Sequence, residues 1–216
     1  MIVIACNFVQ SCKMTTYDKK FEHAVRILQE HGGIIRTREA LDRGIHRRVL
    51  YAMRDLGVLE CLSRGVYKLK DIPPLGNPDL VIVARRVPDG VICLISALSY
   101  HSITTQIPHE IYLAIPRTTS YPRIEYPPVK AIMFSEQTFN AGIEEHEIDN
   151  TLVRIYSPEK TIADCFKYRN KLGIDVAVEA LKLYRERKNL KVDKLIEYAK
   201  VCRVEKVMKP YLEATL

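Results

Sequence analysis

A proline-rich break near the first third of the chain most limits how this sequence can fold. Three prolines and a glycine fall within the eight residues from Asp71 to Pro78, and such clusters interrupt helices and central strands. With 216 residues, the chain is long enough for two domains. We therefore expect an N-terminal extension over residues 1–14, a first domain over residues 15–72 and a second over residues 73–216.

Hydrophobic periodicity before this break predicts three helices followed by a β-hairpin. Apolar residues recur at helical spacing in the first and third helices, and two β-rich runs flank the turn Ser63-Arg64-Gly65. The order helix, short extended stub, helix, helix, hairpin is typical of a winged helix-turn-helix, whose third helix enters the major groove of DNA. The expected elements are helices over residues 18–31, 38–43 and 46–56 and strands over residues 58–62 and 66–69.

Positive charge is concentrated in the same part of the chain. Residues 34–70 hold nine Lys and Arg against four Asp and Glu, whereas residues 77–216 hold twenty against eighteen. A basic segment embedded in folded periodicity indicates a surface that binds a polyanion, because phosphates attract Lys and Arg and release counterions on contact. Double-stranded DNA is the expected partner.

The candidate DNA-binding residues lie on the third helix, on the hairpin and at the start of the second helix. Arginine forks match guanine edges and phosphates, and a tyrosine can reach a phosphate, while a helix N-terminus suits a backbone phosphate. The alternatives are a protein adaptor whose basic face never touches DNA and, at position 37, a simple helix cap. The candidate residues are Thr37, Arg38, His46, Arg47, Arg48, Tyr51, Arg54, Arg64 and Lys68.

After the break, the pattern predicts an α+β domain with a small sheet and a helical tail. Asp149-Asn150 marks a turn between two strands, and Ser157 followed by Pro158 is a good helix start. The small sheet could be antiparallel or mixed. We expect helices over residues 78–87, 91–101, 158–172, 174–187, 192–202 and 204–214 and strands over residues 110–115, 129–134, 142–148 and 152–156.

The sequence lacks the residue patterns of several common classes of catalytic site. There is no glycine-rich phosphate loop and no nucleophile elbow, and the six cysteines form no Cys-x-x-Cys pair and no zinc-ligand spacing with histidine. We expect no catalytic residues, no metal, no cofactor and reduced thiols. Asp164 is explained by surface ion pairs with Lys160 and Lys167, three or four residues away on one helix.

One acidic cluster leaves an enzymatic alternative open. Glu144, Glu145, His146, Glu147 and Asp149 could hold a divalent metal, as in a metal-dependent nuclease. These residues alternate along an expected hairpin, however, so that one face would simply be hydrated. We favour the hydrated hairpin and expect no enzyme.

The expected compartment is the cytoplasm. The longest apolar runs fall far short of the ~20 residues that cross a bilayer, so we expect no membrane association. Residues 1–12 are apolar, but no basic segment precedes them and no small-residue cleavage site follows, which argues against a signal peptide. Either Met1 or Met14 could be the natural start.

Three segments together resemble the AbiEi family of type IV toxin–antitoxin antitoxins, which are also described as regulators of viral defence. The segments are Gly33–Ala40 continuing to Gly65-Val66-Tyr67, Ile95–His101 continuing to Gln106-Ile107-Pro108, and Ser157–Asp164. The resemblance implies a repressor that binds inverted repeats in its own operator. It also implies a C-terminal domain that counters a nucleotidyltransferase-like toxin encoded beside it, without a stable complex.

Overall fold

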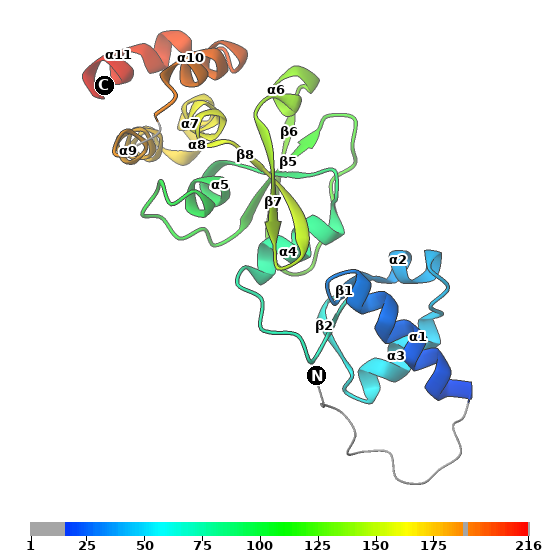
Figure 1. Cartoon of the computed structure of the whole chain (residues 1–216). Helices are drawn as coiled ribbons and strands as arrows, with labels where there is room; N and C mark the ends of the chain where they lie inside the picture. Colours follow the sequence, from blue (N-terminus) through cyan, green and yellow to red (C-terminus); the bar gives the residue numbers. More distant parts are fainter. Residues whose placement is uncertain (1–15, 188–189, 216) are drawn as a thin grey trace. The chain divides into compact units, whose positions relative to one another are not determined.

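A computed structural model describes residues 16–187 and 190–215 (Figure 1). The fold is mixed α+β, as the sequence predicted in outline, and the chain forms two compact units, one ending at Pro74 and the other beginning at Leu75. Within the described residues, every helix is too short or too polar to span a membrane. The expected extension over residues 1–14, with both possible start sites, lies outside the described residues.

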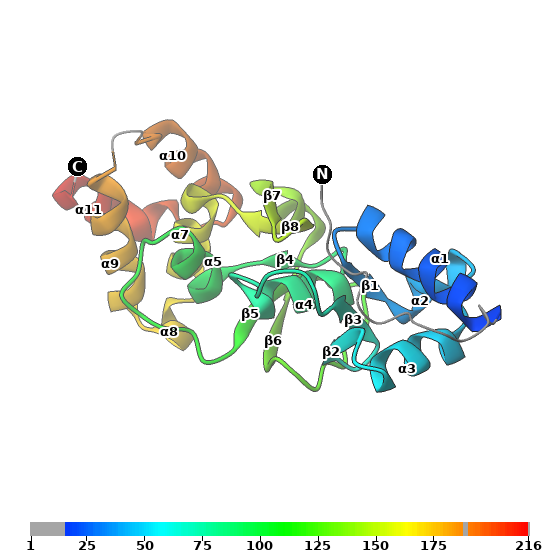
Figure 2. The ribbon, with the colours of Figure 1, turned by 60° about the horizontal axis from the view of Figure 1, so that its bottom comes forward.

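From residue 16 onward, the first unit consists of three helices and a small antiparallel sheet (Figures 1 and 2). The central strand is β3, with β1 on one side and β2 on the other. This arrangement of helices and hairpin is that of a winged helix-turn-helix. The elements are α1 (Thr16–Glu30), β1 (Ile34–Arg36), α2 (Thr37–Asp42), α3 (Arg47–Asp55), β2 (Leu59–Ser63) and β3 (Val66–Leu69).

A separate hydrophobic core holds this unit together. Leu28 of α1, Ile35 of β1 and Leu50 of α3 have no solvent-exposed surface, and they pack with Met53 and Tyr67. Burying an aliphatic side chain of this size contributes roughly 1.5–3 kcal/mol. The unit therefore fixes the orientation of α3 through contacts of its own.

The second unit is a five-stranded mixed sheet with helices gathered on it. The strand order is β6-β5-β4-β8-β7; β5 and β6 run parallel, as do β4 and β8, and the other pairs are antiparallel. Helix α7 contacts α5, α9 and α10 and lies at the centre of the helical layer (Figure 1). The elements are α4 (Pro78–Arg86), β4 (Val91–Ile92), α5 (Leu94–Tyr100), β5 (Ile111–Pro116), β6 (Val129–Phe134), α6 (Glu136–Asn140), β7 (Ile143–Ile148), β8 (Thr151–Tyr156), α7 (Pro158–Lys167), α8 (Arg169–Leu172), α9 (Ile174–Arg185), α10 (Val192–Val201) and α11 (Glu205–Thr215).

Local signals placed two junctions of this unit correctly. The turn at Asp149-Asn150 has positive φ angles of 48° and 56°, a conformation that Asp and Asn tolerate. Ser157 caps α7 by accepting a hydrogen bond from the backbone N–H of Lys160 at 3.3 Å, with Pro158 as the first helical residue. Short polar side chains that satisfy backbone groups locally therefore set these boundaries.

Two helices expected for this unit have other bounds, and one helix was missed. The predicted helix over residues 91–101 begins as strand β4, because the apolar β-branched pair Val91-Ile92 inserts between β5 and β8. The predicted helix over residues 158–172 ends at Lys167 and continues as the short α8. Helix α6 was not predicted. Apolar runs shorter than about ten residues do not distinguish a buried strand from a buried helix.

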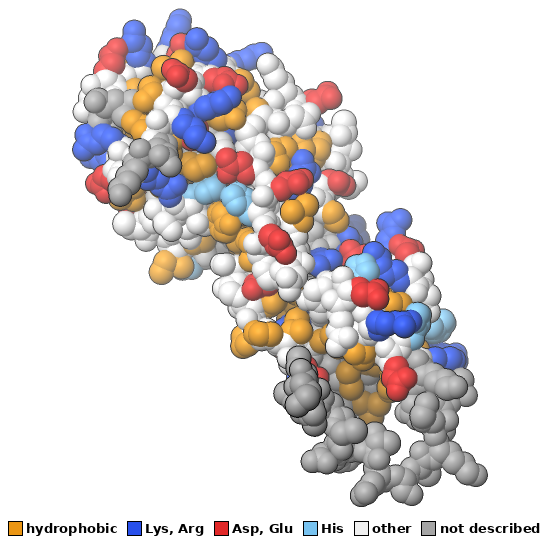
Figure 3. Space-filling model, viewed as in Figure 1, with side chains coloured by type: hydrophobic (Ala, Val, Ile, Leu, Met, Phe, Trp, Pro, Cys, Tyr) orange, Lys and Arg blue, Asp and Glu red, His pale blue; other side chains and the backbone are white. Residues whose placement is uncertain are grey.

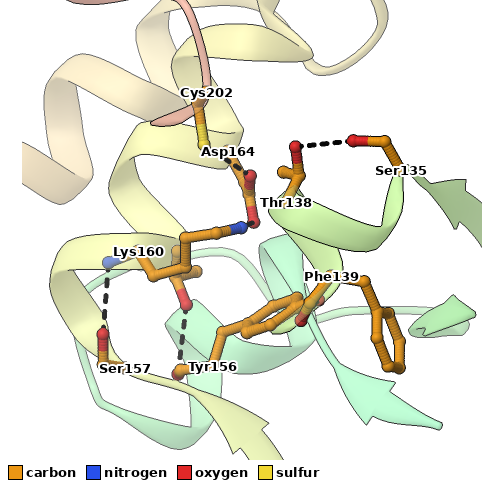
Figure 4. A network of polar contacts seen from close by, with 9 residues as sticks. Ser135, Thr138, Phe139, Tyr156, Ser157, Lys160, Asp164 and Cys202 are labelled. Carbon is orange, nitrogen blue, oxygen red and sulfur yellow. Dashed lines mark hydrogen bonds and ion pairs between the residues drawn. The ribbon is translucent and has the colours of Figure 1, made fainter. Parts of the chain in front are cut away.

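The expected surface ion pair of Asp164 is instead completely buried. Asp164 and Lys160 have no exposed surface, and the Nζ of Lys160 lies 2.5 Å from Oδ2 of Asp164. The Sγ of Cys202 donates to the other carboxylate oxygen at 3.2 Å, and the Lys160 ammonium lies 4.2 Å from the ring centroid of Tyr156 (Figure 4). This run of α7 is thus part of the interior, and its contacts hold α10 and β8 against the helix.

Candidate nucleic-acid interface

Helix α3 is positioned by its cap and by its apolar face. The Nδ1 of His46 accepts a hydrogen bond from the backbone N–H of Arg48 at 3.2 Å, which satisfies one of the free donors at the helix start. Val49, Leu50 and Met53 point into the core of the first unit. The predicted DNA-binding residue His46 is thus exposed and acts as the N-cap.

The opposite face of α3 is basic and exposed. Arg47, Arg48, Tyr51 and Arg54 follow each other at spacings of one, three and three residues, which places them along one side of a helix. All four are exposed, Tyr51 at 43%. The structure therefore brings together the third-helix residues that the sequence singled out.

Asp55 partly neutralises this face at one end. The guanidinium of Arg54 donates to Oδ1 of Asp55 at 2.7 Å and lies 5.3 Å from the ring centroid of Tyr51, and the hydrogen bond to Asp55 raises the pKa of Arg54. Both partners of the ion pair are exposed, and exposed ion pairs contribute only about 0–1 kcal/mol. Arg54 can therefore exchange this carboxylate for a phosphate at little cost.

Of the two hairpin residues predicted to contact DNA, one is exposed and one is enclosed. Arg64 is exposed at the β2–β3 turn. Lys68 does not fit the prediction: its side chain is only 7% exposed and its Nζ lies 3.7 Å from Oε2 of Glu60. β3 is the central strand of the small sheet, so Lys68 is enclosed by its neighbours instead of facing solvent.

The start of α2 is held by other contacts than those expected. Thr37 is the first helical residue and not the cap, and both its backbone N–H and its hydroxyl donate to the carbonyl of Gly65, at 2.9 and 3.3 Å. The carboxylate of Glu39 accepts from the backbone N–H of Arg36 at 3.0 Å. Thr37 therefore ties α2 to the hairpin turn, whereas Arg38 is exposed.

Sequence reasoning left out further basic side chains of this unit, and two of them lie close in sequence to the predicted DNA-binding residues. Arg43 at the end of α2 and Lys70 after β3 are both exposed. Only the local excess of positive charge pointed to them, because neither belongs to a predicted DNA-reading element. Figure 3 shows Lys and Arg side chains on the visible surface of both units, so that exposure by itself does not mark an interface.

The acidic cluster of the nuclease alternative does not converge on one point. Glu144 and His146 share one face of β7, whereas Glu145 and Glu147 are exposed on the other. The carboxylate of Asp149 accepts instead from the backbone N–H of Gly76 at 3.0 Å. The five residues therefore do not form one metal-binding group.

Residues 24–70 match the AbiEi antitoxin family of transcriptional regulators. The resemblance stated from the sequence is confirmed for this AbiEi-like region, which contains α2, α3, the hairpin and the last part of α1, residues 24–30. The exposed basic face of α3 lies inside the matched region. No protein of curated function matches the chain in sequence.

The whole chain also resembles a solved structure. The crystal structure of the Rv2827c protein from Mycobacterium tuberculosis superposes with a TM-score of 0.52 and covers 95% of this chain and 84% of that one. The two sequences are 12% identical. At this identity, the likeness supports the fold of the chain and says nothing of its ligands.

Proposed function

We propose that this protein is a DNA-binding transcriptional repressor and antitoxin of a type IV toxin–antitoxin system, in the manner of AbiE phage defence. In this proposal, the first unit binds operator DNA with inverted repeats, and the second counters a nucleotidyltransferase-like toxin. The protein acts in the cytoplasm and catalyses no reaction. The observation that carries the proposal is the exposed basic face of α3 within the AbiEi-like region.

The proposed interface assigns different tasks to its residues. Arg47 and Arg48 lie in the first turn of α3, where a recognition helix meets base edges in the major groove. Tyr51 and Arg54, one and two turns further along, reach sugar and phosphate. Arg64 at the hairpin tip contacts the adjacent backbone, and such contacts position the protein without reading sequence.

Lys68 has no place in this interface. Its ammonium is enclosed and faces Glu60. It therefore cannot reach a DNA phosphate while β3 is paired within the sheet. Thr37 supports the interface from within, because it links α2 to the turn that carries Arg64. Arg38 remains a candidate for a phosphate contact.

A binding assay with paired DNAs tests the repressor function. Fluorescence anisotropy would compare the chain's own upstream DNA with a scrambled duplex at two salt concentrations. We expect preference for the upstream DNA and weaker binding at higher salt, since each phosphate contact releases counterions. Equal, weak binding to both duplexes would contradict sequence-specific repression, and specific binding that ignores salt would contradict the assigned phosphate contacts.

Charge-matched variants then test the assigned residues. Arg47→Ala with Arg48→Ala removes two charges from α3, and we expect a loss of about 2–6 kcal/mol of operator binding, from about 1–3 kcal/mol for each lost base contact. The matched control is Lys182→Ala with Lys206→Ala, which removes two exposed charges from the second unit. If the two double variants weaken operator binding equally, the loss reflects the total charge of the protein, and the assignment of α3 as the DNA-binding helix is contradicted.

A growth assay tests the antitoxin function separately. The gene beside this one would be expressed as the toxin, and the full chain would be supplied from an unrelated promoter. We expect the chain to restore growth, and we expect the Arg47→Ala, Arg48→Ala variant to restore it equally, because the proposed antitoxic unit is the second one. Failure of the unaltered chain to restore growth would refute the antitoxin proposal and leave the repressor proposal standing.

A further inference from the structure

Three side chains that are distant in the sequence converge in the second unit. His101 ends α5, and Glu144 and His146 lie two residues apart on the same face of β7. Each offers one possible ligand atom, and these atoms lie within 4.8 Å of one another. The imidazole centroids of the two histidines are 5.8 Å apart, and Figure 3 shows histidine side chains at the surface of this unit.

One ring nitrogen of His146 is buried without a hydrogen-bond partner among the described residues. Its Nε2 is shielded from solvent, and no group in the described part of the chain forms a hydrogen bond with it. The Oε2 of Glu144 lies 3.3 Å away, but the pair does not have hydrogen-bond geometry. Buried polar atoms without a partner are rare in proteins and indicate a missing water, ion or ligand.

The contacts of His101 are those of a metal-ligating histidine. Its Nε2 lies 2.8 Å from the backbone carbonyl of Tyr156, so this nitrogen carries the proton and the lone pair stays on Nδ1. Metal-binding histidines almost always donate their other ring N–H in this way, which fixes the ring and the tautomer.

The geometry points to a binding site for a divalent transition metal of the zinc class, formed by His101, Glu144 and His146. Two imidazoles and one carboxylate are a ligand set of such ions, with a fourth position left open. Ligand distances of about 2.0–2.2 Å place neighbouring donors roughly 3–3.5 Å apart, so ligand atoms that now lie within 4.8 Å of one another need to close by up to about 1.5 Å. Partial exposure of all three residues leaves room for that adjustment.

A cavity beside the three residues gives the metal an open side. It has a volume of about 350 Å³, and its lining includes the three ligands, Glu159 and Arg187. The Glu159 carboxylate accepts a hydrogen bond from the hydroxyl of Tyr184 and is not among the ligand atoms that lie within 4.8 Å of one another. The cationic Arg187 favours water or a small anion at the fourth position.

Zinc binding by the full chain tests this inference. Protein freed of metal by chelation would be titrated with zinc alone, by calorimetry and by competition with a chromophoric chelator, and native mass spectrometry would give the stoichiometry. We expect one zinc ion for each chain. We expect His146→Ala to weaken binding by more than about 100-fold, because changes to groups behind the ligands already cost about 10- to 100-fold.

Matched variants and a second metal separate this site from adventitious binding. His109→Ala removes an exposed histidine of the same unit, and Glu145→Gln alters the opposite face of β7; both should bind zinc as the unaltered chain does, whereas Glu144→Gln should weaken binding. Circular dichroism without metal checks the fold of each variant. Equal zinc affinity of His146→Ala and His109→Ala overturns the inference, as does a thiolate charge-transfer band in the cobalt-substituted protein, which would place the metal on cysteine.

Discussion

Removing one member of the buried ion pair in α7 should strongly destabilise the second unit. In Asp164→Ala, the Lys160 ammonium loses its carboxylate partner at a position with no exposed surface. The rings of Tyr156 and Phe134, at 4.2 and 5.1 Å from Nζ, offer only partial compensation for a full charge. Burial raises the pKa of Asp164, and Lys160 opposes this effect, so the carboxylate depends on Lys160 to remain charged.

The expected loss is about 3–5 kcal/mol in the free energy of unfolding, which is the usual effect of leaving one charge of a buried pair without its partner. For a unit of this size, a loss of 1 kcal/mol lowers the melting temperature by about 2–4 °C. The unfolding transition of the second unit should therefore shift downward by about 6–20 °C. The surface variant Glu197→Ala, which breaks the exposed pair with Lys194, should cost at most about 0.5 kcal/mol.

Urea unfolding followed by circular dichroism, with a double-mutant cycle, measures this effect. The double variant Lys160→Met, Asp164→Leu removes both charges and fills much of the same space, and such replacements are often close to neutral. We expect it to be more stable than Lys160→Met alone or Asp164→Leu alone, the two single variants of the cycle. A loss below about 1 kcal/mol in Asp164→Ala, or additive losses in the double variant, would refute the reasoning that the pair is buried and mutually dependent.

Three further predictions follow from residue placement. Arg64→Ala should weaken binding to operator and scrambled DNA by similar factors in fluorescence anisotropy, whereas Lys68→Met should leave binding unchanged because its ammonium is enclosed; an equal loss in both would contradict the buried position. Gly142→Ala should lower stability to urea by more than the 1–2 kcal/mol typical of a positive φ, because φ is +71° and the new Cβ would meet a buried lysine side chain at 2.7 Å. Cys61 is exposed and should react with iodoacetamide at pH 8, whereas burial raises the pKa of Cys202 to about 12 and keeps it an unreactive thiol; peptide mass mapping that finds both alkylated in the native protein would contradict this.

Much of the first unit could be predicted because its signals are local. Apolar residues at helical spacing, glycines at helix ends and a basic turn between two β-rich runs each act within a few residues, and they gave the correct order of elements. The exposed face of α3 followed from the same periodicity, since burying Leu50 and Met53 turns Arg47 and Arg48 outward. Lys68 was misplaced because its strand is central, and the pairing of Ile34 with Lys68 joins segments more than thirty residues apart.

In the second unit, local patterns predicted most elements but not how the elements pair and pack. Most of its strands and helices could be predicted from the sequence. The position of β4 between β5 and β8 could not, because hydrophobic periodicity does not indicate which strands pair. The segment that carries part of the family resemblance, Ser157–Asp164, contributes capping and a buried ion pair and has no surface face of its own. Resemblance therefore located an important segment without showing what it does.

The sequence by itself determined the succession of elements, the position of the basic helix and the AbiEi-like character of residues 24–70. Only the tertiary structure decided that Asp164 meets Cys202 in the interior and that His101 meets His146 beside a cavity. The physical reason is that local patterns record the polarity of one face of a helix or strand. What packs against that face is decided by chain segments far away, whose contacts appear only when the whole unit has folded.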